Sequence, residues 1–345
     1  MKRLFSHQKR TLLALLLPAF LAFFSPVFAQ HEDHAQQAAE PKLNVGEVIL
    51  DHVKDSHVWH FTESVVIPLP VIVYTKADGL KIFSSGNFFE HHHAVPYGDY
   101  TLEKEHIFYQ GQPVLDLSIT KNVVMLFINA TLMLLIFTTA ARAYGKRKGL
   151  APKGVQSFME PVILFVKDEI VKPNIGPRYW TFLPYLLTLF FFIFFGNLLG
   201  LLPGAANLTG NIAVTLCLAL LTFIITNVNG NKNYWGHIFW TPGVPHWLRI
   251  IILPVELIGV FTKPFALTVR LFVAITAGHI VLLALTSLTF IFQRWSVGIG
   301  TSLVNLFISL IELLVAAIQA YVFTMFTALY IGQAIEEHEH DDGHH

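Results

Sequence analysis

Charged residues and cysteines are both scarce in this chain of 345 residues. Charged side chains make up 13% of it, the formal net charge is +0, and Cys217 is its single cysteine. One thiol excludes a disulfide framework and a metal site built from several thiolates. The balanced charge gives no reason to expect nucleic acid as a partner. Hydrophobic residues reach 54%, which is too many for an ordinary soluble protein and indicates a membrane protein.

The N-terminus has the features of an export signal. A basic start is followed by an apolar core and by the sequence Val27-Phe28-Ala29, which predicts a signal peptide at residues 1–29. The alternative is an uncleaved membrane anchor, but the core is short and contains Pro18. Export would place residues 30–117 outside the cytoplasm.

Residues 30–117 are expected to form a small extracytoplasmic region. Residues 65–74 and 79–83 are rich in β-formers and are bounded by turn residues, which predicts short strands. Histidines cluster at 91–93 and at 338–345, but neither cluster has ligand spacing on a rigid scaffold, so no metal site is predicted.

Residues 118–336 read as an all-α polytopic membrane domain with about five membrane helices. The spans are expected at 122–141, 180–203, 211–228, 250–292 and 300–334. Residues 153–174 mix apolar and charged side chains and predict an amphipathic helix on the membrane surface. Lysines and arginines follow the first span, so the positive-inside rule places that end in the cytoplasm. Counting crossings gives an extracytoplasmic N-terminus and a cytoplasmic His/acidic tail at 337–345.

The last two apolar runs are too long to stand upright in a bilayer. The 43 residues of 250–292 would span about 64 Å as one helix, against a hydrocarbon core of about 30 Å. Such a helix must tilt strongly, kink or break, and Pro264 favours a kink. We therefore expect a long, tilted hairpin.

Charged side chains interrupt this hairpin. Glu256, Lys263 and Arg270 are spaced by seven residues, which places them in one slowly drifting stripe on a helix. Each charge at bilayer depth costs roughly 2.5–3.5 kcal/mol. The stripe must therefore face protein or water, which makes its members candidate functional residues.

The last helix carries two polar side chains in a matching register. Glu312 and Gln319 are also seven residues apart. If the two helices pair as an antiparallel hairpin, His279 comes opposite Glu312 and Arg270 comes near Gln319. Polar groups in lipid need partners, so this coincidence indicates a site.

These residues resemble those of a known family. The segment Arg270-Leu271-Phe272, followed by Ala277-Gly278-His279, resembles subunit a of the membrane sector of rotary F-type ATP synthases. Residues 197–204 and 213–221 are similar to earlier spans of that family, and the resemblance covers roughly residues 116–335. Two differences from the family are visible. Ala274 stands where the family often has an asparagine. Some relatives have the acidic residue at the position of His279 and the histidine at the position of Glu312.

The resemblance implies a proton-translocating stator subunit in the bacterial inner membrane, with no catalytic site of its own and no cofactor. Its partners would be the c-ring, the b subunits of the peripheral stalk and the lipid bilayer. The long hairpin would wrap the c-ring, and Arg270 would face the ring as a fixed charge that prevents a proton short-circuit. Gln319 would form a hydrogen bond near Arg270 and position it.

The same resemblance implies two half-channels. His279 and Glu312 would lie in the extracytoplasmic one, and Glu256 would lie towards the cytoplasmic exit. Lys263 has two readings, either a secondary functional residue or a side chain that extends to the membrane interface. The residues alone do not distinguish H⁺ from Na⁺ as the coupling ion.

Other classes of function explain these residues less well. A stand-alone secondary transporter for a divalent metal or another cation predicts internal repeats and broken helices, and neither is evident. A haem-bearing subunit needs two deep histidines, whereas only His279 qualifies. A purely structural scaffold leaves the buried charges unexplained.

Overall fold

The computed structural model describes residues 54–336, apart from 63–64, 77, 91–92, 104, 147–150, 203, 241–244 and 293–294. These residues fall within one unit, Asn44–His345, and the other unit, Met1–Leu43, is outside the described residues. The predicted signal peptide, the C-terminal tail at 337–345 and the histidines at 91–92 also lie outside the described part.

The extracytoplasmic region expected from the sequence contains small antiparallel sheets. The sheet orders are β1-β2, β10-β3-β4, β5-β6 and β7-β8-β9. The strands are β1 Val58–Thr62, β2 Val65–Pro68, β3 Pro70–Thr75, β4 Gly79–Ser84, β5 Phe89–Glu90, β6 His93–Ala94, β7 Tyr100–Glu103, β8 His106–Tyr109, β9 Gln112–Pro113 and β10 Leu115–Asp116, with the short helix η1 Ser85–Phe88. The strands predicted at 65–74 and 79–83 are therefore confirmed.

Alternation along β3 builds the core of this region. Val71 and Val73 point inwards and are fully buried, whereas Tyr74 is exposed, as the two-residue period of a strand requires. Phe88 and Ile107 complete the same apolar cluster. The core is small, so polar contacts with the membrane domain matter for the placement of this region.

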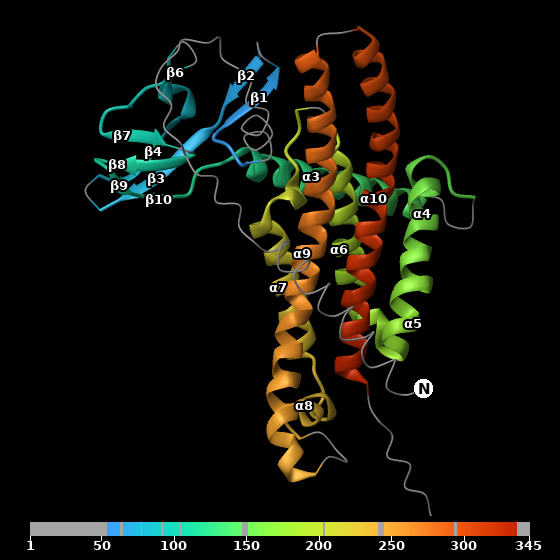
Figure 1. Ribbon diagram of the computed structural model, residues 1–345. Coiled ribbons are helices and arrows are strands. Elements are labelled where there is room, and N and C mark those ends of the chain that lie inside the picture. Colours follow the sequence, from blue (N-terminus) through green and yellow to red (C-terminus); the bar gives the residue numbers. More distant parts are fainter. Residues whose placement is uncertain are drawn as a thin grey trace, which may run out of the picture. The chain divides into compact units, whose positions relative to one another are not determined.

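The membrane domain is helical throughout (Figure 1). Its elements are α3 Lys121–Lys146, α4 Val155–Phe165, the π-helix η2 Val166–Val171, α5 Lys172–Ile175, η3 Gly176–Arg178, α6 Tyr179–Gly200, η4 Leu208–Gly210, α7 Ile212–Val228, α8 Lys232–Phe239, α9 His246–Phe292 and α10 Trp295–Ile335. Among the described residues, four helices are long and apolar enough to cross a membrane, or five if the pair α7 and α8, bent by 102°, counts as one span. This agrees with the predicted all-α polytopic fold.

The helix expected at 153–174 is divided by a π-helical segment. The α-helical hydrogen-bond pattern stops at Phe165 and resumes at Lys172. Pro173, in the α5 segment that follows, has no N–H to donate to a carbonyl one turn earlier. Sequence periodicity did not reveal this change.

Helices α9 and α10 form the long hairpin that the sequence predicts. They lie side by side and run in opposite directions, in orange and red in Figure 1. α9 has 47 residues and continues through Pro254 and Pro264 without a break. At 1.5 Å per residue it is about 70 Å long, so it must tilt strongly to stay within a bilayer.

A stripe of small buried residues lets α10 approach its neighbours closely. Ala316, Ala320, Thr324, Ala328 and Gly332 recur every four residues, and all are buried. Residues at this spacing share one face of a helix, and small residues on that face allow helix backbones to pack tightly in lipid. The contacts of α10 with α5, α6 and α9 make it the central helix of the domain.

Buried amides join the helices across these close contacts. Asn197 of α6 donates from Nδ2 to the carbonyl of Ala316 at 3.2 Å and accepts from Thr209 Oγ1 at 2.6 Å. Asn129 of α3 donates from Nδ2 to the carbonyl of Phe192 at 3.0 Å. Such bonds stabilise helix pairs where no water competes for the polar groups.

Candidate functional site

The antiparallel register of α9 and α10 brings His279 and Glu312 together, as the sequence predicts. His279 Nδ1 lies 3.6 Å from Glu312 Oε1. The side chain of Glu312 is only 3% exposed and that of His279 is 21% exposed. A carboxyl group this deeply buried needs a charged or polar neighbour, and His279 lies close to it.

Gly278 provides the space in which the carboxyl group of Glu312 lies. A Cβ atom at position 278 would come within 2.9 Å of Glu312 Oε1. The carboxyl group is thus packed against the backbone of α9, one residue before His279. Sequence reasoning placed Gly278 in a motif but did not assign it this role, which depends on the facing side chain.

We expect Gly278→Ala to reduce proton pumping by about tenfold without loss of stability. The added methyl group meets the mobile end of a side chain, so Glu312 turns away from His279 instead of forcing the helices apart. ATP-driven acidification of inverted vesicles measures the effect, and the melting temperature of the purified complex should not change. Gly300→Ala is the control, because a Cβ on Gly300 of α10 has nothing within 4 Å and Gly300 lines neither this cavity nor the larger pocket described below. Equal pumping by both variants would contradict the role of Gly278.

A cavity of about 180 Å³ surrounds the pair and is called here the His279–Glu312 cavity. Thr276 and Ser309 add hydroxyl groups to its wall. The other lining residues come from α9, from the end of α6 and the residues after it, and from the start of α3: Leu282, Leu283, Gly200, Leu201, Leu202, Gly204, Ala205, Asn207 and Lys121. The cavity is large enough for several water molecules and has polar groups to hold them.

Arg270 is exposed on α9 and points away from this cavity's polar pair. Nine residues separate Arg270 from His279, which is about half a revolution of a helix. The guanidinium carbon of Arg270 lies 4.2 Å from the ring centre of Phe326 on α10. Among the described residues the guanidinium group forms no ion pair.

Gln319 does not form the expected hydrogen bond with Arg270 within the described residues. It is half-buried on α10, and Phe326, seven residues further along, lies against the guanidinium group instead. Counting residues from the turn of the hairpin placed Arg270 near Gln319. The arginine side chain is long, however, and can extend along α10 to Phe326. The contribution of Phe326 was not predicted.

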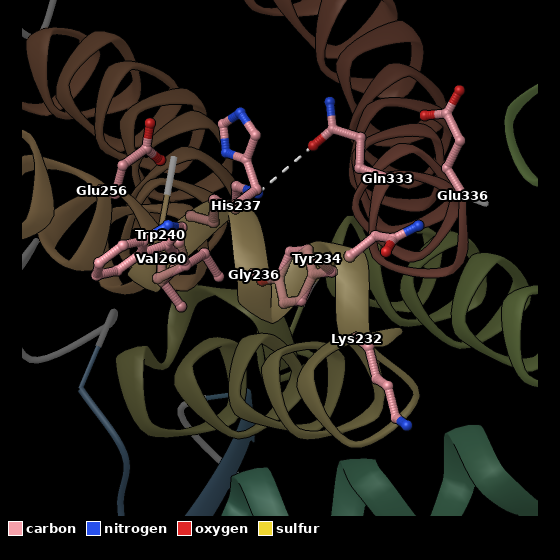
Figure 2. Close-up of a pocket in the computed structure, with 13 residues that line it drawn as sticks. Lys232, Tyr234, Gly236, His237, Trp240, Glu256, Val260, Gln333 and Glu336 are labelled. Atoms are coloured by element: carbon pink, nitrogen blue, oxygen red, sulfur yellow. Dashed lines mark hydrogen bonds between the residues drawn. The ribbon is translucent and has the colours of Figure 1, made fainter. Parts of the chain in front are cut away.

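A second, larger pocket lies at the far end of α10 (Figure 2). This Glu256 pocket has a volume of about 550 Å³ and is lined by Glu256 and Lys263 of α9, Tyr234 and His237 of α8, and Gln333 and Glu336 at the end of α10, among others. Lys263 Nζ donates to Gln333 Oε1 at 3.4 Å and lies 5.1 Å from the ring centre of Tyr330. Glu256 and Lys263, two members of the predicted stripe, therefore line the same pocket.

The order of these groups along α9 defines the site. The Glu256 pocket comes first, Arg270 follows about 10 Å beyond Lys263, and His279 lies about 13 Å further along, at 1.5 Å per residue. Two separate polar spaces thus flank one exposed cation. The described residues contain no cluster of three or more histidine, cysteine or acidic side chains suited to a metal ion.

Comparison with known proteins assigns the two parts of the chain to two families. The family described as ATP synthase A chain matches residues 123–332. A domain of unknown function, DUF8433, matches residues 48–123.

Several curated relatives are similar over most of the chain. "ATP synthase subunit a 2" of Chlorobaculum tepidum is 40% identical over 93% of this chain and 82% of its own length. "ATP synthase subunit a 2" of Chlorobium luteolum is 38% identical over 96% of both chains. "ATP synthase subunit a" of Chloroherpeton thalassium is 45% identical over 67% of this chain and 70% of its own.

These matches favour a subunit of the synthase over a stand-alone transporter, and they agree with a chain that has no catalytic site of its own. They also agree with several apolar helices in a multi-pass membrane protein. The chain belongs to the ATP synthase A chain family, the proton-translocating subunit of the synthase membrane sector.

Proposed function

We propose that the two polar spaces along α9 are two proton half-channels and that Arg270 separates them. The His279–Glu312 cavity carries protons from the extracytoplasmic side to a ring of c subunits. The Glu256 pocket carries them from the ring to the cytoplasm. The observation that supports this most directly is the exposed Arg270 guanidinium between two separate polar spaces.

Arg270 acts as a fixed charge. A guanidinium group stays protonated at any accessible pH, so it does not relay protons. It attracts the carboxylate of an arriving c subunit, favours its ionised form and so drives proton release into the exit. The same charge repels a proton that would pass directly between the half-channels. Phe326 of α10 holds the guanidinium group in place. Gln319, also on α10, forms a hydrogen bond with Arg270 when the ring is present.

This arrangement supports the following partners and orientation. The exposed face of α9 around Arg270 lies against the c-ring, and the b subunits of the peripheral stalk hold the chain against rotation. Residues 30–117 are extracytoplasmic and the C-terminus is cytoplasmic, in the inner membrane. The positive charge of Arg142 near the end of α3 supports this orientation.

The contact between His279 and Glu312 provides a test by exchange. We expect His279→Glu alone and Glu312→His alone each to lower ATP-driven proton pumping at least about tenfold, because each leaves two like groups facing each other in a buried cavity. The double exchange restores one acid and one imidazole, so pumping returns to a large part of the unmodified rate. The measurement uses inverted vesicles, with assembly checked by co-purification of the c-ring.

The exchange has a clear contrary outcome. If the doubly substituted complex assembles and pumps no better than the single variants, the pair does not function as one unit. If Glu312→Ala pumps normally, the His279–Glu312 cavity is not the inlet.

A further inference from the structure

A short segment of the β region lies along the start of α3. This rim segment comprises residues 55–59. Asp55 accepts hydrogen bonds from Thr120 Oγ1 at 2.8 Å and from the backbone N–H of Asn122 at 3.2 Å. The backbone N–H of Lys121 donates to the carbonyl of Ser56 at 3.0 Å. A carboxylate that binds the free N–H groups at a helix N-terminus caps the helix and complements its dipole. Asp55 therefore fixes the first turn of α3.

The rim segment also reaches the loop that walls the His279–Glu312 cavity. Trp59 is buried, and its Nε1 donates to the carbonyl of Gly204 at 2.7 Å. Gly204 and Lys121 both line that cavity. The rim segment thus joins two parts of the cavity wall that are more than 80 residues apart in the chain.

His57 ties the rim segment to the rest of the β region. Its Nδ1 lies 3.1 Å from Glu105 and its Nε2 lies 2.9 Å from Asp116, and the ring is buried. Burial works against a charge on the ring, but the hydrogen bonds to the two carboxylates outweigh it and raise the pKa of His57 to about 9. At neutral pH the ring is therefore charged and held from both sides.

These contacts hold a lysine in the wall of the cavity. Lys121 lines the cavity together with His279 of α9 and Glu312 of α10. The carboxylates of Asp55 and Glu105 act on its charge from the β region. Lys121 thus interacts with two acidic groups of the β region and lines the same cavity as Glu312.

We propose that Lys121 is a further charged residue of the proton inlet, positioned by the rim segment and the β region. The inference rests on the proposed function of the His279–Glu312 cavity as the inlet. A fixed positive charge in the wall favours the ionised carboxylate of Glu312 and the neutral ring of His279. Protons then pass through the pair without being held too tightly, which is the condition for rapid transfer. The β region has the role of holding this charge in place.

The test is the dependence of ATP synthesis on inlet pH. Proteoliposomes with the whole complex receive a constant potassium diffusion potential and a constant pH on the ATP-forming side, and the pH on the inlet side is varied. We expect Lys121→Gln to shift the midpoint of the rate to higher pH by about half a unit, because the pair binds its proton more tightly without the cation. Lys121→Arg keeps the charge and should keep the midpoint. Lys81→Gln removes a lysine of β4 that does not line the cavity and should also leave it unchanged.

Asp55→Asn provides a second measurement that does not replace the lysine. It removes the opposing negative charge, so the midpoint should shift to lower pH, opposite to Lys121→Gln. General loosening of the structure would reduce the rate of both variants without opposite shifts. Midpoints that stay at the unmodified value in both variants would overturn the role of Lys121. That result leaves the inlet assignment standing if Glu312→Ala still abolishes synthesis, so the two proposals fail separately.

Discussion

Arg270→Ala is expected to abolish ATP-driven proton pumping, with a loss of at least about 100-fold, while the complex still assembles. An exposed arginine at this depth costs several kcal/mol in lipid, so its removal does not harm folding of the chain itself. Without the positive charge, the c-ring carboxyl groups keep their protons as they pass this point, so proton transfer from the ring to the exit stops. The measurement is acidification of inverted vesicles, with the c-ring co-purified to confirm assembly.

Two further variants sharpen this test. Arg178→Ala removes an exposed arginine of η3, outside the candidate site, and should pump normally. Arg270→Lys keeps the charge but loses the flat group that lies against Phe326, so we expect pumping between that of Arg270→Ala and the unmodified complex. Normal pumping by assembled Arg270→Ala would show that the residue is structural, and the assignment of the two half-channels would fail with it.

Gly332→Ala is expected to destabilise the subunit by about 2 kcal/mol or more, because α10 then clashes with α5. A Cβ atom at position 332 would overlap the backbone carbonyl oxygen of Asn174. Unlike the carboxyl group of Glu312, this oxygen belongs to the backbone and has no rotamer that moves it aside. The two helices must separate, which opens the close packing along the small-residue stripe of α10.

The effect is measured as the melting temperature of the purified complex and the amount of subunit in the membrane. Gly300→Ala is the matched control, because it lies in the same helix and a Cβ there has nothing within 4 Å. Equal melting temperatures for both variants would mean that α5 and α10 do not pack as closely as described. Gly278→Ala should lower proton pumping at an unchanged melting temperature, whereas Gly332→Ala should lower the melting temperature.

Several features followed from local pattern alone. Long apolar runs predict membrane helices because lipid requires every backbone polar group to be paired within the span. The strands at 65–74 and 79–83 and the hairpin of α9 and α10 were predicted in this way and are present. Even the contact of His279 with Glu312 followed, because only two residues separate the end of α9 from the start of α10 and the register can be counted from there.

Other features depend on how helices rotate and slide against each other. Phe326 under Arg270 lies seven residues beyond the position that counting favours. The π-helical segment Val166–Val171 has no distinct periodicity in the sequence. Hydrophobic spacing identifies the buried face of a helix, but the offset between two packed helices is set by which side chains interlock.

By itself, the sequence determined the class of protein, its long apolar helices, and the polar residues whose burial in lipid costs free energy. Only the tertiary structure decided that Gly278 makes room for Glu312, that Gly332 admits Asn174, and that Lys121 shares a cavity with His279. The difference has one physical cause. The period of 3.6 residues is a property of each helix on its own, whereas contacts between residues of different helices exist only after the helices pack.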